Sequence, residues 1–175
     1  YEDTLLDIAR RFDLGFVEIQ AANPNLDPWV PGENEKVIIP SMHLLPDAPH
    51  EGIVVNLGDM RIYRFDDRGR AVKSYPIGVG RDGMKTPLGT SSVVNKKEGP
   101  WWYPTQRMKN EDPSLPDVIK QSPQNPLGTH ALYLGWPTYA IHGTNEPWGI
   151  GRRVSSGCMR MYPEDIPVLY NEVAI

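Results

Sequence analysis

Two different hydrophobic patterns divide the chain near residue 52. In residues 4–12 and 16–22 the apolar positions recur every three or four residues, which predicts two short amphipathic helices. Thr4 is suited to cap the first helix, and Asn23, which is followed by proline, ends the second. A brief apolar run at residues 36–39 predicts a strand after the two helices.

From residue 52 onward, apolar and polar positions alternate as they do in β-strands. Turn residues such as Gly and Asp separate the alternating segments, which predicts a meander of hairpins. Strands are predicted at residues 53–57, 61–65, 71–79, 91–94, 131–134 and 139–142. Residues 96–127 are rich in Pro, Asn and Trp and are predicted to form a long structureless loop, which is either a lid or a segment packed on the sheet. A short helix is predicted to begin at Pro163.

These patterns predict a mainly β protein with a small helical appendage. We expect an α+β module over residues 1–40, a proline-containing linker over residues 41–50 and a β-rich domain over residues 51–175. His43 and His50 lie in the linker without the Cys/His/Asp spacing of a metal site, so they are predicted to be exposed and to bind no metal.

Charge and hydropathy exclude some classes of function. The net charge is −4, and eight acidic against three basic side chains in residues 1–40 account for it. The sequence has no cluster of basic residues of the kind that would indicate a nucleic-acid partner. No apolar run approaches the roughly 18 residues of a membrane span, so an integral membrane protein is not expected. No signal peptide is visible at Tyr1.

The candidate chemistry lies between residues 141 and 161. This stretch holds Cys158, the only cysteine, and His142, one of four histidines. A lone cysteine cannot form an intramolecular disulfide, and the preceding Ser-Ser-Gly run places Cys158 on a turn, as suits a reactive thiol. Because the thiolate is the nucleophile, the thiol needs a nearby base, and His142 is the candidate. Backbone N–H groups of the turn are suited to bind an oxyanion.

The third member of such a site is less evident from the residues alone. No Asp or Asn stands out as an orienting group, but a backbone carbonyl next to His142 is able to hold its second ring nitrogen. A papain-like or NlpC-type peptidase is disfavoured because in those families the cysteine precedes the histidine.

The N-terminal segment resembles a LysM module. The matching segments are Asp3-Thr4-Leu5, Ile8-Ala9-Arg10-Arg11-Phe12, Ile19-Gln20-Ala21-Ala22-Asn23-Pro24 and Ile38-Ile39-Pro40. The resemblance implies a β-α-α-β unit that binds glycan containing N-acetylglucosamine. Glu2 stands where the family has glycine, and the strand before it is missing, so the module is expected to be incomplete and to act either in packing or in glycan binding.

The rest of the chain resembles the L,D-transpeptidases, also called the YkuD domain. The signature segments are His142-Gly143-Thr144, Gly149-Ile150-Gly151 and Ser155-Ser156-Gly157-Cys158-Met159-Arg160. Three upstream segments also match: Thr86-Pro87-Leu88-Gly89-Thr90, Asn125-Pro126-Leu127-Gly128 and Tyr139-Ala140-Ile141. The resemblance implies a β-sandwich-like catalytic domain. Ser156 and Met159 depart from the more common histidine and Ile or Val.

The resemblance assigns a role to each position of the signature. It implies that Cys158 is the nucleophile, that His142 is the general base and that the Gly143 carbonyl orients the imidazole. It also implies that the N–H groups of Gly157 and Cys158 bind the oxyanion and that Arg160 steadies the turn or meets a substrate carboxylate. Ser155, Ser156 and Thr144 complete the candidate oxyanion and substrate-binding residues.

The implied function is acyl transfer on peptidoglycan stem peptides in the periplasm or cell envelope, through a thioester and without metal or organic cofactor. The acceptor amine belongs to another stem peptide or to a lipoprotein lysine, and carbapenems are expected to acylate the enzyme. Two alternatives remain open: an L,D-carboxypeptidase or endopeptidase that hydrolyses the same thioester, and a non-catalytic protein that binds the cell wall.

Overall fold

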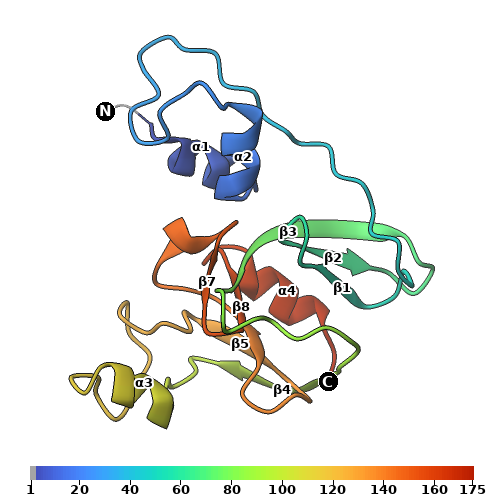
Figure 1. The fold of residues 1–175 in the computed structure, drawn as a ribbon. Coiled ribbons are helices and arrows are strands. Elements are labelled where there is room, and N and C mark those ends of the chain that lie inside the picture. The colour runs from blue at the N-terminus through green and yellow to red at the C-terminus, as the bar shows by residue number, and fades with distance from the viewer. Residues whose placement is uncertain (1–2) are drawn as a thin grey trace.

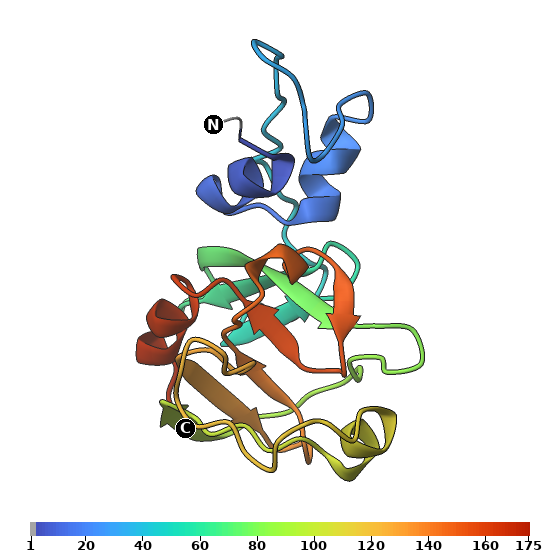
Figure 2. The same ribbon diagram turned by 90° about the vertical axis from the view of Figure 1, so that its left-hand side faces the viewer.

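The computed structural model describes residues 3–175. A small helical module lies over one end of a larger domain built on a β-sheet, and an extended segment connects the two (Figures 1 and 2). The prediction that Glu2 takes the place of a glycine lies outside the described residues. No helix within the described part of the chain has the length and apolar character needed to cross a lipid bilayer.

The module consists of two helices, α1 (Leu5–Arg11) and α2 (Phe16–Ala22), as predicted. The Thr4 hydroxyl accepts a hydrogen bond from the Asp7 amide, and the Asp7 carboxylate accepts one in return, so the first turn is capped in both directions. The buried side chains of the module form a small core of their own: Leu5, Ala9, Leu14 and Ile19.

The predicted strand at residues 36–39 is wrong: this segment is extended but pairs with no strand in residues 3–175. The Asn23 side chain explains the difference. Its carbonyl oxygen accepts from the Ile38 amide at 2.7 Å, and its amide donates to the Ile38 carbonyl at 2.8 Å. One buried side chain thus satisfies the backbone groups that a neighbouring strand would otherwise bind. The structure of the described residues therefore contains no LysM-type strand pair.

The larger domain is mainly β, as predicted. Its strands are β1 (Ile53–Asn56), β2 (Arg61–Phe65), β3 (Ala71–Gly80), β4 (Val93–Glu98), β5 (His130–Leu134), β6 (Ala140–His142), β7 (Arg153–Ser155) and β8 (Met159–Met161). Seven of the strands described here follow one another in the order β1-β2-β3-β8-β6-β5-β4, and β7 pairs with β3. The first half of β3 pairs with β2 and its end with β8 and β7, so one long strand joins two parts of the sheet.

Helix α4 (Ile166–Glu172) closes the core of this domain. Ile166 and Leu169 are fully buried against side chains from one face of the sheet. The residues that they join are Ile62, Tyr75, Ile77, Val79, Leu132, Ile141, Met159 and Met161. Because side chains alternate along a strand, the neighbours of these core residues point to the opposite face. That opposite face carries the candidate site.

The long segment after β4 is more ordered than predicted. Strand β4 continues to Glu98, and a short helix α3 (Gln106–Glu111) begins after Thr105, whose hydroxyl accepts from the Met108 amide. The fully buried Asn125 holds the segment to the sheet domain, since its amide donates to the Pro100 carbonyl at 2.7 Å.

The module is fixed to the sheet domain by backbone hydrogen bonds. The amide of Phe16 donates to the Ile150 carbonyl at 3.1 Å, and the amide of Val17 to the Gly151 carbonyl at 3.3 Å. This approach requires glycine on both sides: a Cβ on Gly151 would lie 2.3 Å from the Gly15 Cα. The two parts of the chain therefore touch backbone to backbone.

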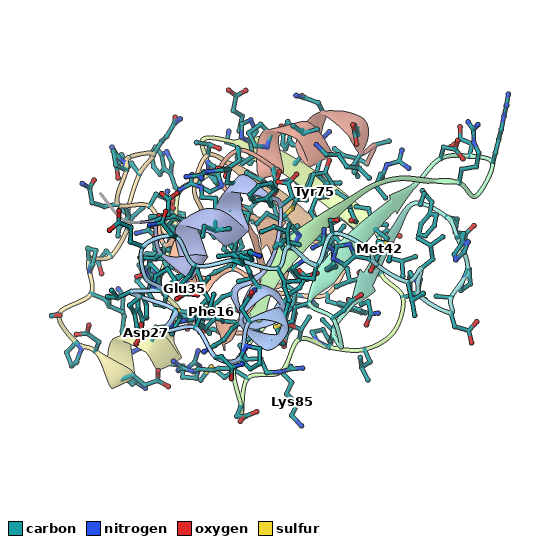
Figure 3. All side chains as sticks on the ribbon, turned by 90° about the horizontal axis from the view of Figure 1, so that it is seen from above. Phe16, Asp27, Glu35, Met42, Tyr75 and Lys85 are labelled. Carbon is teal, nitrogen blue, oxygen red and sulfur yellow. The ribbon has the colours of Figure 1, made fainter. Side chains whose placement is uncertain are left out.

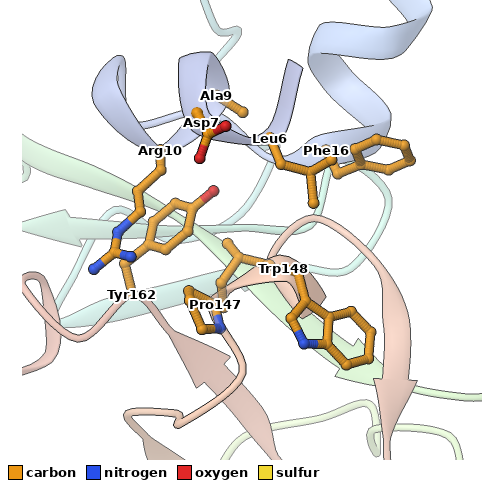
Figure 4. A pocket seen from close by; sticks show the side chains of 9 residues that line it. Leu6, Asp7, Ala9, Arg10, Phe16, Pro147, Trp148 and Tyr162 are labelled. Atoms are coloured by element: carbon orange, nitrogen blue, oxygen red, sulfur yellow. The ribbon is translucent and has the colours of Figure 1, made fainter. Parts of the chain in front are cut away.

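Side chains extend the contact between the module and the sheet domain. Arg10 forms a two-pronged ion pair with Glu164, and the buried Arg61 donates to the Asp13 carbonyl at 3.0 Å and to Glu18 at 3.2 Å. A crevice of about 130 Å³ remains between α1 and the 3-10 helix η1 (Pro147–Gly149). Its lining residues are Leu6, Asp7, Ala9, Arg10, Phe16, Pro147, Trp148, Ile150 and Tyr162 (Figure 4).

The prediction that both linker histidines are exposed is confirmed for His50 and wrong for His43. His43 is half-buried and contacts the Glu18 carboxylate, which also binds Arg61. His50 stacks on Phe65 with ring centroids 4.5 Å apart. Other linker side chains are exposed, Met42 almost completely; its position is labelled in the view from above (Figure 3).

Candidate active site

Strand alternation separates the candidate residues from the core. Strands β6 and β8 pair in parallel, with Ile141 opposite Met159 and His142 opposite Arg160. Ile141 and Met159 belong to the core that packs on α4. His142 and Arg160 therefore share the other face, and Cys158, immediately before β8, shares it as well. The sheet thus places on one face the two residues that the sequence singled out.

His142 is 4% exposed, and its ring is held in one orientation. Its Nδ1 lies 2.6 Å from the carbonyl oxygen of Gly143. A carbonyl only accepts hydrogen bonds, so Nδ1 carries the proton and Nε2 of the neutral ring is free to take one. Burial, together with the charge of Arg160, lowers the pKa of His142 to about 4. The imidazole is therefore a neutral, oriented base at neutral pH.

The turn that carries Cys158 is built around the buried Ser155. Its hydroxyl donates to the Cys158 carbonyl at 2.6 Å and accepts from the Gly157 amide at 3.1 Å. Ser156 is half-buried beside it. The Gly157 amide, predicted to bind the oxyanion, is directed at Ser155 in this structure. Gly157 has φ +112°, and a Cβ there would lie 2.7 Å from the Tyr139 ring, so only glycine fits.

The Cys158 thiol is half-buried and lies 3.5 Å from the carbonyl oxygen of Thr138, to which it donates. Burial raises the pKa of the Cys158 thiol, against the smaller opposite effects of the Ala140 amide and of Arg160. The same environment thus favours a neutral thiol and a neutral imidazole at neutral pH. It follows that the proton moves during attack on substrate, not before it.

Arg160 lies on the site face with most of its side chain buried. It binds the Glu146 carboxylate at 3.2 Å, and no acceptor among the described residues reaches its Nε. Thr144 is also buried, but its hydroxyl accepts from the Glu146 amide at 2.9 Å. Thr144 therefore shapes the turn after His142, and Arg160 retains unused hydrogen-bonding capacity next to the base.

Two residues near the thiol were not singled out from the sequence. Tyr133 of β5 is the partner of Ala140, which places its side chain on the site face, and burial and the Cys158 charge raise its pKa. Thr86 donates to the Gly157 carbonyl at 2.8 Å and accepts from the Gly80 amide at 3.0 Å, so it fixes the cysteine turn. The Thr-Pro-Leu-Gly motif could have identified Thr86 from the sequence. No feature of the sequence pointed to Tyr133.

Comparison with known proteins shows which family this chain resembles. Residues 50–175 match the L,D-transpeptidase catalytic domain, YkuD. The chain is 41% identical over 174 residues to the probable L,D-transpeptidase YcfS of Escherichia coli (strain K12), covering 95% of this chain and 54% of that protein. It is 42% identical over 172 residues to the probable L,D-transpeptidase YbiS of the same strain, covering 95% of this chain and 56% of that protein. The chain thus spans about half the length of these relatives.

The fold is shared with solved structures as well. The NMR structure of the catalytic domain from E. faecium L,D-transpeptidase superimposes with a TM-score of 0.55 at 23% identity, covering 74% of this chain and 94% of that one. The family match covers the strands and turns that carry His142 and Cys158. The chain belongs to the L,D-transpeptidase family, with its catalytic domain at residues 50–175.

Proposed function

We propose that this protein is a peptidoglycan L,D-transpeptidase of the periplasm or cell envelope. The donor is a tetrapeptide stem, cleaved at the bond between the L-centre of meso-diaminopimelate and the terminal D-alanine. The observation that carries the proposal is the shared face of β6 and β8. There the buried His142, held by the Gly143 carbonyl, is a diagonal neighbour of Cys158.

In the first half-reaction the sulfur of Cys158 attacks the carbonyl carbon of the donor. The thiol proton passes to Nε2 of His142, the nitrogen that the Gly143 contact leaves free. The carbonyl oxygen becomes an oxyanion, for which the Cys158 amide is the proposed donor. When the carbon–nitrogen bond breaks, His142 returns the proton to the nitrogen of D-alanine, and the acyl group stays on sulfur as a thioester.

In the second half-reaction an amine attacks the thioester. Its proton passes through His142 to the departing Cys158 sulfur, which restores the resting thiol. The acceptor is the amine of another stem peptide or a lipoprotein lysine. We propose that the Arg160 guanidinium, which pairs with Glu146 through Nη1, meets a carboxylate of the substrate through its other terminal nitrogen. Ser155, Ser156 and Thr144 support the turns around the reacting carbonyl.

The decisive experiment incubates the purified protein with disaccharide-tetrapeptide and identifies the products by mass. A crosslinked dimer with loss of one D-alanine supports transfer. A tripeptide without dimer indicates that water resolves the thioester, as in a carboxypeptidase. Unchanged tetrapeptide, with no acyl-enzyme on the intact protein, overturns the proposal. A peptide carrying a lysine at the lipoprotein-type acceptor position distinguishes the two acceptor amines.

Acylation by a carbapenem tests the nucleophile separately. The intact protein is expected to gain the mass of one carbapenem, and Cys158→Ala is expected to gain none. In His142→Gln a side chain of similar volume replaces the imidazole, but the base is lost. Acylation of this variant is therefore expected to be much slower. A non-catalytic wall-binding protein would show no mass increase at all.

We further propose that the helical module acts mainly as a docked support for the sheet domain. The backbone contacts of Phe16 and Val17 and the Arg10–Glu164 ion pair support this role. Glycan binding is tested by sedimenting the whole protein with purified sacculi. Cosedimentation that is lost on substituting the exposed Trp29, with activity on soluble donor retained, would assign glycan binding to the module.

A further inference from the structure

Thr138 has a backbone conformation that its residue type disfavours. It lies in the turn between β5 and β6 with φ +71°, in the left-handed region. For a β-branched residue this conformation is a genuine outlier, and such strain persists where the surrounding structure imposes it. The Thr138 side chain is exposed, so packing of that side chain does not impose the conformation. The turn imposes it: Trp136 to Tyr139 form a β-turn with Pro137 in its second position, and Thr138 takes the positive φ that a type II turn requires in its third.

The turn around Thr138 is held from several sides. The Leu134 amide donates to the Tyr139 carbonyl at 3.0 Å, and the Tyr139 amide donates to the Trp136 carbonyl at 3.2 Å. The Tyr139 ring also lies against Gly157 in the cysteine turn, where no side chain would fit. The two turns therefore pack directly on one another.

This packing directs the Thr138 carbonyl at the nucleophile. The Cys158 sulfur lies 3.5 Å from the Thr138 oxygen, and the thiol is the donor of this contact. A carbonyl oxygen is able to bind S–H but repels a thiolate. The contact thus favours the proton on sulfur, against the Ala140 amide and the Arg160 charge, which both favour the thiolate. It also turns the sulfur toward Thr138, whereas the proposed reaction needs that proton at His142.

We propose that Thr138 is a positioning residue that keeps the resting nucleophile in its protonated form. Its carbonyl, aimed by the left-handed backbone, accepts the S–H hydrogen bond until a bound substrate displaces the sulfur toward His142. The inference rests on the proposed acyl transfer for its purpose, but the hydrogen bond itself exists in the free protein. A resting thiol held in this way reacts slowly with small electrophiles that do not fill the site.

The single cysteine makes this contact directly observable. Cys158 carries the only S–H group, so its infrared stretch is free of overlap with other thiols. Subtracting the spectrum of Cys158→Ala isolates the band in the substrate-free protein. We expect a band shifted to lower frequency than that of an unbonded thiol. A band at the unbonded position would overturn the proposal without any variant at Thr138.

Two substitutions at Thr138 separate the backbone conformation from the side chain. Thr138→Gly removes the side chain but readily adopts positive φ, so the shifted band is expected to remain. Thr138→Pro fixes φ near −65° and turns the carbonyl away, so the shift is expected to disappear. The rate of Cys158 alkylation by iodoacetamide at neutral pH should then rise about two- to threefold, the low end for a hydrogen bond because S–H is a weak donor, and the pH profile of alkylation should move to lower pH.

Asn34→Pro is the matched control, because Asn34 is also exposed and left-handed, with φ +62°, but lies in the helical module. It is expected to change neither the band nor the alkylation rate. A folded Thr138→Pro protein with the wild-type band and alkylation profile would overturn the proposal. Because neither measurement needs turnover, a failure of transpeptidation with a shifted S–H band would reject the proposed function and leave this contact standing.

Discussion

Arg160 of β8 is the strand partner of His142 of β6, so a permanent positive charge lies beside the candidate base. This charge reinforces the effect of burial, and together they lower the pKa of His142 to about 4. The ring therefore stays neutral through the pH range in which an ordinary histidine becomes charged. The arrangement leads to a direct prediction about pH.

The acid limb of the pH profile is expected to lie well below that of an unperturbed histidine. Transfer should remain active as the pH is lowered to about 5, because the His142 ring becomes protonated, and so unable to act as a base, only at lower pH. Arg160→Met is expected to raise the pKa of His142, whereas Arg160→Lys retains the charge and should raise it less. NMR titration of the His142 ring in the substrate-free protein measures both effects apart from substrate binding. An unchanged titration in Arg160→Met would contradict the role given to the guanidinium.

Asp165, the residue before α4, is expected to make stability depend on pH. Burial, reinforced by Asp13 and Glu164 and opposed by Lys73 and Arg61, raises the pKa of Asp165 to about 7. In the unfolded chain this carboxyl ionises near pH 3.9, so between about pH 4 and pH 7 the unfolded state binds fewer protons. The contribution of Asp165 to folding therefore falls through this range, by at most about 1.4 kcal/mol per pH unit.

Asp165→Asn removes the titration while keeping the size of the side chain. Its stability relative to the natural protein is expected to increase from about pH 4 to about pH 8, as measured by urea unfolding. A stability difference that is the same at both pH values would show that Asp165 is ionised in the folded protein already at the lower pH.

The backbone contact between the module and the sheet domain is testable at Gly151. Gly151→Ala introduces a left-handed alanine, at a cost on the order of 1 kcal/mol, and a clash with Gly15 that adds about 1–3 kcal/mol. Gly83→Ala is the matched control, since Gly83 has a similar φ of +80° and no atom within 4 Å of the added Cβ. Equal losses of unfolding free energy in the two variants would mean that the module moves aside without cost.

Asn125 is expected to order the long segment between β4 and β5. Its side chain binds the carbonyls of Pro100, Ile119 and Lys120 and the amide of Leu127. Asn125→Ala leaves buried groups unpaired and should cost about 2–3 kcal/mol. Hydrogen exchange should accelerate in this segment first. Asn110→Ala, at an exposed position of α3, is the control and should leave the exchange rates unchanged.

The sequence predicted those parts of the fold that local signals determine. Helices α1 and α2 follow from apolar spacing and from the Thr4 cap, and the alternation predicted at residues 61–65 and 139–142 coincides with β2 and β6. The strand at residues 36–39 failed because the partner of its backbone is a side chain, Asn23, fifteen residues away from Ile38. Helix α3 was missed because it buries no residue and so has no hydrophobic period.

The candidate site was predictable as a set of residues but not as a geometry. The His142–Gly143 contact involves neighbouring residues, and the structure contains it as the family resemblance implied. The resting partner of Cys158 was not predictable, because Pro137 indicates a turn but does not show that the left-handed Thr138 carbonyl reaches a residue twenty positions away. The Gly157 amide was assigned to the oxyanion from the motif alone, without knowledge that Ser155 already accepts from it. The catalytic roles of these residues stay predictions.

The parallel register of β6 and β8 has an evolutionary consequence. Met159, a core residue, is the strand partner of Ile141. Cys158, which carries the reacting sulfur, is the residue immediately before Met159. Inserting one residue between Cys158 and Met159 would break this adjacency, because it would move either the sulfur or the core methionine to the other face of the sheet. Such an insertion is therefore expected to be rejected, whereas a change of length earlier in the turn leaves the pair in place.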